Sequence, residues 1–217
     1  MATETGTGAA TAKASATTTD TATATKAAPG TRERLVGTAS RLMQHGGYEN
    51  TPVKQLVREA GATLGSLYHF FPGGKRELAV AAIHFGDEEF AGMLRAGLDA
   101  HPDPAEALRA LARLLADALA DSDWRDGCPV TATALETVGR LPEIQEACAR
   151  AFAHWQEVVA AKLLASGIGE EDARDLAVTI VAALEGAETT AQLTSSRTPL
   201  LLAGHHLARL VTTYTPA

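Results

Sequence analysis

A run of hydrogen-bond donors between Thr63 and Lys75 is the part of the sequence best suited to chemistry. Tyr68 and His69 carry a phenol and an imidazole, which can donate to a phosphate oxygen or to a base edge. Gly65 has no side chain, so another backbone can approach it closely. Lys75 falls at the predicted start of a helix, where its charge adds to free N–H groups and the positive end of the helix dipole. A Tyr-His pair on a helix is more often ordinary surface, so these residue types indicate contact with the phosphates and bases of double-stranded DNA only where a motif fixes their direction.

Three short helices are predicted to position these donors. The first has Thr31 as N-cap and stops at Gly46-Gly47. The second begins at Thr51-Pro52, with Thr51 as N-cap and Pro52 in the first turn. Gly61 ends the second helix, because glycine accepts the left-handed backbone that a tight turn needs. Thr63 then caps a third helix, in which Leu67 and Phe71 lie four apart on the buried face. Two short helices joined by a glycine turn are typical of the helix-turn-helix motif, whose second helix enters the major groove.

The rest of the chain also favours helices, and no segment shows the sustained alternation of a strand. We therefore predict an all-α fold of three regions: a disordered Ala/Thr-rich tail over 1–30, a helix-turn-helix DNA-binding domain over 31–77, and a larger helical ligand-binding and dimerisation domain over 78–217. The helices predicted in the third region run over about 75–98, 105–120, 129–138, 142–164, 170–194 and 199–213.

Charge and composition narrow the class of protein. The net charge is −7, yet residues 31–77 carry more basic than acidic side chains, which suits DNA binding by this part alone. Cys128 and Cys148 form no disulfide framework and have no metal-ligand spacing, so neither a metal nor a cofactor is expected. No apolar run reaches the roughly 18 residues of a membrane span, and the first residues lack the apolar core of a secretion signal. A cytoplasmic location and no membrane partner are the resulting expectations.

The stretch from Gly61 to Lys75, supported by Gly47-Tyr48 and Thr51-Pro52-Val53, resembles the DNA-binding domain of the TetR family. Tyr68 and Lys75 would then hold phosphates. Many relatives carry Lys or Arg where this chain has Leu64, so we expect an apolar contact with a thymine methyl group there. The resemblance implies DNA contact by Thr51, Thr63, Leu64, Gly65, Ser66, Tyr68, His69 and Lys75.

Asp126-Gly127-Cys128-Pro129-Val130, followed by Ala134-Leu135-Glu136, resembles the LmrA/YxaF-like branch of that family, whose members respond to drugs or flavonoids. A small hydrophobic or aromatic effector is the implied partner. Aromatic walls suit flat ligands, although each of the residues concerned could equally be ordinary core. Cys128 is more readily a small core hydrophobe than a thiol sensor. The predicted ligand-binding residues are Phe90, Trp124, Cys128, Leu135, Phe152 and Trp155.

The last two helices are expected to form a homodimer interface. One apolar stripe comprises Leu176, Ile180, Leu184 and Ala187, and the other comprises Leu200, Leu207, Leu210, Val211 and Tyr214. A two-fold contact would place two recognition helices about one DNA turn apart, roughly 34–36 Å. Glu185, Glu188, His205 and His206 fall near this seam, where we expect solvated side chains.

The resulting hypothesis is a ligand-responsive repressor that binds a palindromic operator as a homodimer and is released by its effector. An enzyme is disfavoured, because the sequence offers neither a phosphate-binding glycine loop nor a G-x-S-x-G nucleophile motif. A binding module that has lost DNA affinity is the second alternative, and Leu64 is the residue that favours it. The effector, the operator, and the choice between repression and activation do not follow from the sequence.

Overall fold

The computed structural model of the chain describes Met1 and residues 29–215. The tail predicted over 1–30 therefore lies almost wholly outside the described residues. Helices and turns account for the described part, in which no strand occurs, so the all-α prediction is confirmed. The helices are α1 (Thr31–Gly46), α2 (Val53–Glu59), α3 (Leu64–Phe70), α4 (Lys75–Asp99), α5 (Pro104–Asp121), α6 (Thr131–Thr137), α7 (Pro142–Ala165), α8 (Glu170–Thr194) and α9 (Thr198–Thr212).

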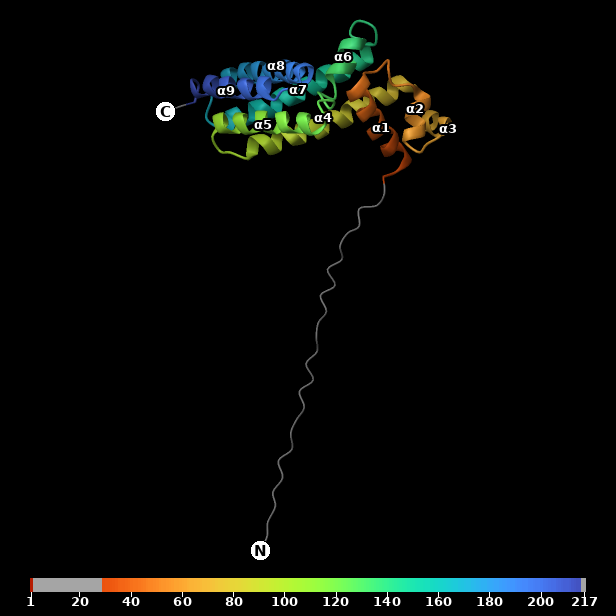
Figure 1. Cartoon of the computed structure of the whole chain (residues 1–217), viewed down its shortest axis with the longest axis horizontal. Helices are drawn as coiled ribbons and strands as arrows, with labels where there is room; N and C mark the ends of the chain where they lie inside the picture. The colour runs from red at the N-terminus through yellow and green to blue at the C-terminus, as the bar shows by residue number, and fades with distance from the viewer. Residues whose placement is uncertain (2–28, 216–217) are drawn as a thin grey trace.

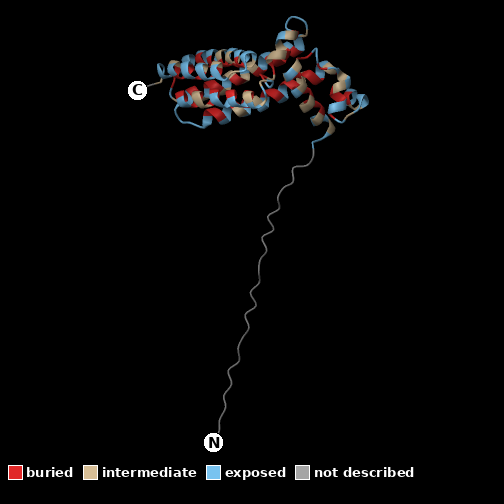
Figure 2. Ribbon diagram, in the orientation of Figure 1, coloured by how far each residue is buried: buried red, intermediate tan, exposed pale blue. Residues whose placement is uncertain are grey.

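The helices form a small head and an elongated body (Figure 1). The head consists of α1, α2 and α3, and α4 runs from it into the body, where it lies beside α5 and α7. Helix α6 lies against α1 at the junction of head and body. Buried residues follow the inward faces of the helices through both parts (Figure 2). None of the helices in the described part is long and apolar enough to cross a membrane.

Local chemistry sets most of the helix boundaries. Asp103 caps α5 by accepting hydrogen bonds from the backbone N–H groups of Ala105 and Glu106, and Pro142 occupies the first turn of α7. Three predicted starts are shifted. Gly30, not Thr31, is the N-cap of α1. Pro52 is itself the N-cap of α2, and α6 begins at Thr131 rather than at Pro129.

The two stripes assigned to the dimer interface lie mostly inside the subunit. Most of their large side chains are buried against neighbouring helices of the same chain, and α9 packs so closely on α5 that a Cβ at Gly204 would lie 2.3 Å from the Cβ of Ala112. Helical periodicity identified a buried face, but it could not tell burial within one chain from burial between two. The buried members are Leu176, Ile180, Leu184, Leu200, Leu207 and Val211.

Candidate nucleic-acid interface and effector cavity

The turn between α2 and α3 fixes the direction of α3. Gly61 adopts a left-handed conformation with φ of 58°, as the turn requires. The Thr63 hydroxyl accepts a hydrogen bond from the Ser66 backbone N–H at 3.0 Å, which caps α3. Arg34 on α1 donates from Nε to the Ala60 carbonyl at 3.0 Å and so ties the turn to the first helix. Sequence patterns predicted the cap and the glycine, but not this long-range contact of Arg34.

Burial of Leu67 and Phe71 leaves the rest of α3 as one broad exposed face, as the four-residue spacing predicted. Leu64 and Tyr68, at the sides of this face, are 45% and 54% exposed. The face presents a continuous set of neighbouring residues to a partner. Its exposed or half-buried members among the predicted DNA contacts are Thr63, Leu64, Gly65, Ser66, Tyr68 and His69.

Thr51 and Lys75 differ from the other predicted DNA contacts. Thr51 is buried, and its hydroxyl donates to the Gly47 carbonyl at 2.8 Å, so it supports the head internally instead of facing solvent. Lys75 is half-buried at the start of α4, with its ammonium 4.2 Å from the centroid of the Tyr48 ring. Burial lowers the pKa of Lys75, against the opposing influence of Glu49 and a second nearby carboxylate.

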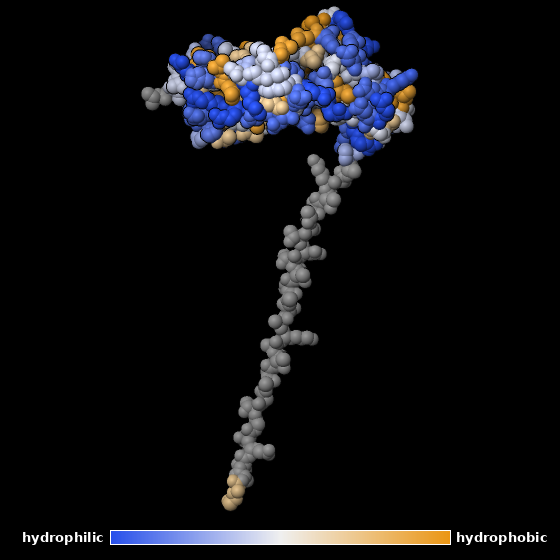
Figure 3. Space-filling view, in the orientation of Figure 1, coloured by the Kyte–Doolittle hydropathy of each residue, from blue (hydrophilic) through white to orange (hydrophobic). Residues whose placement is uncertain are grey.

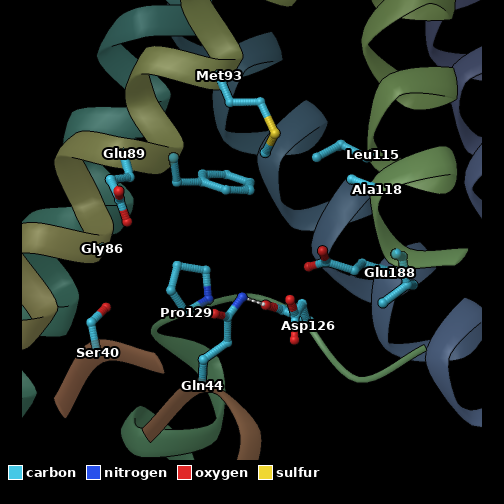
Figure 4. Close-up of a pocket in the computed structure, with 13 residues that line it drawn as sticks. Ser40, Gln44, Gly86, Glu89, Met93, Leu115, Ala118, Asp126, Pro129 and Glu188 are labelled. Atoms are coloured by element: carbon cyan, nitrogen blue, oxygen red, sulfur yellow. Dashed lines mark hydrogen bonds between the residues drawn. The ribbon is translucent and has the colours of Figure 1, made fainter. Parts of the chain in front are cut away.

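A cavity of about 240 Å³ lies where the head meets the body (Figure 4). Met93 and Glu188 point into it from α4 and α8, and Gln44 reaches it from α1. It is smaller than most drug-sized sites and suits a compact ligand. Its lining is Ser40, Gln44, Gly86, Glu89, Phe90, Met93, Leu115, Ala118, Leu119, Asp126, Gly127, Pro129 and Glu188.

The predicted aromatic wall is only partly assembled around this cavity. Phe90 lines it, and its ring centroid lies 4.6 Å from that of Trp155, which in turn lies 4.9 Å from Phe152. Trp155 is completely buried behind Phe90 and so supports the wall from within. Trp124 is partly buried against the core and does not line the cavity.

Leu135 does not belong to this wall. It is 75% exposed on the outer face of α6, where Figure 3 shows hydrophobic surface, and Val138 beside it is 59% exposed. The sequence could not place Leu135, because α6 spans only two turns. So short an apolar segment does not reveal which of its faces is packed.

Two glutamates of α8 lie beside Cys128 and are not solvated as predicted: Glu188 is buried and Glu185 is half-buried. The ligand atoms of Cys128, Glu185 and Glu188 all lie within 4.8 Å of one another. Burial raises the pKa of Glu188 to about 8, and the neighbouring Glu185 adds to the shift. Burial likewise raises the pKa of Glu185, whose carboxylate accepts a hydrogen bond from the Thr131 hydroxyl at 2.8 Å.

The same surroundings keep Cys128 protonated. Burial and the two carboxylates raise the pKa of its thiol well above the ordinary value, which disfavours the reactive thiolate. Cys128 thus contributes volume and a weak hydrogen-bond donor. No sequence spacing linked it to α8, because the loop before α6 and the middle of α8 meet only in the folded chain.

Contacts across the cavity rim connect head and body. Gln44 donates from Nε2 to the Gly127 carbonyl at 2.6 Å, and the neighbouring His45 ring contacts the Asp126 carboxylate. Another contact between head and body lies closer to α2. The Glu49 backbone N–H donates to Glu136 of α6 at 3.0 Å.

Comparisons with known proteins agree with this architecture. Residues 35–82 match the family described as bacterial regulatory proteins, tetR family, and residues 104–206 match the family described as transcriptional regulator LmrA/YxaF-like, C-terminal domain. The uncharacterized HTH-type transcriptional regulator YxaF of Bacillus subtilis is 35% identical over 181 residues, covering 83% of this chain and 95% of the relative. The HTH-type transcriptional regulator LmrA of the same organism is 33% identical over 171 residues, covering 79% and 91%.

Solved structures show the same fold. A TetR transcriptional regulator from Chloroflexus aurantiacus superimposes with a TM-score of 0.71 at 28% identity, covering 85% of this chain and 96% of the other. The regulatory protein TetR from Rhodobacter sphaeroides gives a TM-score of 0.73 at 24% identity, covering 82% and 97%. Fold and relatives together define a DNA-binding transcription regulator, which is a class without enzymatic activity. The chain belongs to the TetR family of bacterial regulators, in its LmrA/YxaF-like branch.

Proposed function

We propose that the chain is a cytoplasmic repressor that binds a palindromic operator as a homodimer and is released by a small aromatic effector. One observation carries this proposal: Ser40 and Gln44 of α1, in the head, form part of the wall of the body's cavity. A ligand there touches both parts at once, so its binding free energy can depend on their relative position, as release requires. The division into a DNA-binding domain over 31–77 and a ligand-binding and dimerisation domain over 78–217 belongs to the same proposal.

The exposed face of α3 is the proposed reading surface. Tyr68 and Lys75 hold phosphates, Gly65 allows close approach of the DNA backbone, and Leu64 contacts a thymine methyl group. The Lys75 ammonium must leave the Tyr48 ring or reach past it to meet a phosphate. Thr51 stabilises the turn before α2 through the buried hydrogen bond from its hydroxyl to the Gly47 carbonyl.

The outer faces of α8 and α9 are the proposed dimer interface, in place of the stripes that proved to be buried. On α8, Val178, Ala182, Gly186 and Leu193 are exposed at helical spacing, and Leu193 is 82% exposed. On α9, Leu201 and Leu202 are exposed beside His205 and His206. Small residues on α8 permit close approach of a second copy, so a four-helix contact would bury this apolar surface.

Release is proposed to pass through the loop between α5 and α6 as well as through α4. Asp123 and Trp124 both adopt left-handed backbone conformations, with φ of 56° and 62°, which are costly for residues other than glycine. The same loop carries Asp126 and Gly127, which contact α1 of the head. An effector that displaces the loop and α4 therefore shifts α1, and with it the spacing of the two recognition helices.

Selection of bound sequences from random duplex DNA, at a stated salt concentration, tests the proposal. We expect enrichment of a palindrome whose half-sites lie about one helical turn apart. A Val178→Asp/Leu202→Asp variant should sediment as a monomer and lose the two-fold site, and Leu135→Asp on the exposed face of α6 serves as the matched control. Weak, strongly salt-dependent binding without enrichment would contradict the operator-binding proposal.

A further inference from the structure

Glu188 is the one carboxylate lining the cavity whose side chain is buried. It is 7% exposed on α8, whereas Glu89 and Asp126 at the rim are exposed. Figure 4 shows its carboxylate directed into the cavity. A buried charge without a partner is costly, and a buried polar group directed into a cavity fits a ligand that pairs with it.

The described residues give Glu188 no cationic partner. No lysine or arginine of residues 29–215 lines the cavity, and neither Glu185 nor Glu188 takes part in an ion pair there. The groups that face Glu188 are Glu185 on the same helix, the protonated Cys128 thiol, and across the cavity Glu89 and Asp126. Asp126 is in contact with His45 and Glu89 is exposed to solvent, so Glu188 and the half-buried Glu185 are the acids of this group that have neither a cationic partner nor full solvation.

Apart from the acids and the polar Ser40 and Gln44 of α1, the side chains that line the cavity are apolar or aromatic. Phe90, backed by Trp155, and the flexible thioether side chain of Met93 line the side formed by α4. An aromatic face near an acid is a combination that recognises organic cations, since the ring quadrupole and the carboxylate both attract positive charge. The cavity volume of about 240 Å³ limits the ligand to a compact molecule.

We propose, building on the function proposed above, that the effector is an aromatic amine whose protonated nitrogen pairs with Glu188 while its ring packs against Phe90. Binding replaces the proton that Glu188 holds in the empty cavity with the ligand's positive charge. That proton is released to solvent, and the ligand supplies the missing partner of the buried acids. A ligand bound in the cavity then acts on the positions of Gln44 and of the loop carrying Gly127, which line the same cavity.

A metal ion is the other cation that such acids could hold. Cys128, Glu185 and Glu188 supply three ligand atoms, but the thiol holds its proton strongly, and Glu185 already accepts the Thr131 hydrogen bond. Glu188 faces the cavity instead of a closed coordination shell. The geometry therefore favours the organic cation over the metal.

Calorimetry with the full chain and three probes of one shape but different charge tests the proposal: 2-phenylethylamine, 2-phenylethanol and phenylacetate. We expect the amine to bind at least about tenfold more tightly than the alcohol, and phenylacetate to bind least. With Glu188→Gln, the preference of amine over alcohol should fall to about threefold or less while alcohol binding is unchanged. Glu89→Gln makes the same substitution at the exposed rim and should keep most of the preference.

Proton release gives a second readout that a merely structural role of Glu188 would not produce. Titrations near pH 7, in buffers of different ionisation enthalpy, should show about one proton released per bound amine and none per alcohol. The affinity for the amine should rise by about tenfold or more from pH 6.5 to 8.5, and Glu188→Gln should abolish this rise.

Three outcomes would overturn the cation proposal: equal binding of amine and alcohol, no amine binding up to about 10 mM, or Cys128-dependent binding of Zn²⁺ with none of the amine. Operator affinity measured without probe separates this inference from the repressor proposal. Amine binding that depends on Glu188 but leaves operator affinity unchanged would support the site while contradicting its role in release. If the wild-type chain without probe did not bind operator DNA, that result would contradict the repressor proposal alone.

Discussion

The exposed face of α3 and the cavity at α8 hold their polar groups in opposite surroundings. On α3, Tyr68 and its neighbours keep their polar groups in solvent, where they cost little to hold until a partner arrives. In the cavity, Glu188 lies out of water with its pKa raised to about 8. The first surface can be mutated with little effect on folding, whereas the second stores an unfavourable interaction that a ligand can relieve. Operator binding and ligand response should therefore respond to different mutations and to different solution conditions.

The largest effect is expected from Tyr68→Ala/Lys75→Ala, which removes two proposed phosphate contacts. Operator affinity should fall by about 100-fold or more, and the salt dependence should become shallower because fewer counterions are released. Fluorescence anisotropy with the selected operator measures both. Arg150→Ala on α7 removes one exposed cation remote from α3 and should leave affinity unchanged. Binding by the double variant within about threefold of wild type would show that the reading surface lies elsewhere.

The two regions also differ in how far the sequence predicts them. Helix α3 was predicted almost completely, because its cap Thr63, the turn at Gly61 and its buried Leu67 all lie within one short run. Each of those features has a local physical cause. The positions of α4, α7 and α8 followed in the same way from hydrophobic period, prolines and glycines, with boundaries within a residue or two.

The cavity was predicted poorly, because it forms from segments far apart in the chain. Phe90 borders the cavity, but Leu135 points outward, and Glu188, which was expected to be solvated, is buried. In sequence, Glu188 is one acid among others on a helix whose burial depends on the packing of α4, α5 and the loop before α6. The buried stripes on α8 and α9 show the same limit, since periodicity alone cannot say what covers a face.

The next largest effect is on the free energy of unfolding, and it should arise from the cavity at α8 and not from α3. Glu188 holds its proton more tightly in the folded than in the unfolded chain, because its pKa is about 8 in the fold against the ordinary value of 4.5. Between these two values the folded state binds more protons, so stability is full below about pH 4.5 and is lost as pH rises through 8. Glu188→Gln removes this loss and should be more stable than wild type by on the order of 3 kcal/mol at pH 8.5.

Urea denaturation between pH 5 and 8.5 measures this difference. Glu89→Gln, at the exposed rim, should follow the wild-type curve. The Tyr68→Ala/Lys75→Ala variant should follow the wild-type curve as well, because both residues are proposed to contact DNA. A Glu188→Gln curve parallel to wild type at every pH would mean that Glu188 is ionised in the fold throughout. Its pKa would then not be raised by burial.

A smaller effect is expected where the two regions meet. Gln44→Ala removes the hydrogen bond to the Gly127 carbonyl at the cavity rim without touching α3. Operator affinity without ligand should stay within about twofold, while the weakening caused by the amine probe should shrink by about three- to tenfold, as expected for one coupling contact of roughly 1 kcal/mol. Gln145→Ala on α7 removes a comparable hydrogen bond, from the Gly139 backbone N–H, and should leave the coupling intact.

The smallest effect should appear at Leu64, the single apolar side chain at the start of the reading surface and 45% exposed. If it contacts a thymine methyl group, Leu64→Ala should weaken binding by about 0.5–1 kcal/mol for that base pair only, with an unchanged salt slope, because no charge is involved. Leu64→Lys should instead raise affinity for all sequences and steepen the salt slope by about one counterion, while relaxing the preference at that position. The two substitutions therefore separate apolar base reading from simple exposure. If Leu64→Ala and Leu64→Lys weakened binding equally for every DNA sequence, Leu64 would help to hold α3 in place without reading a base.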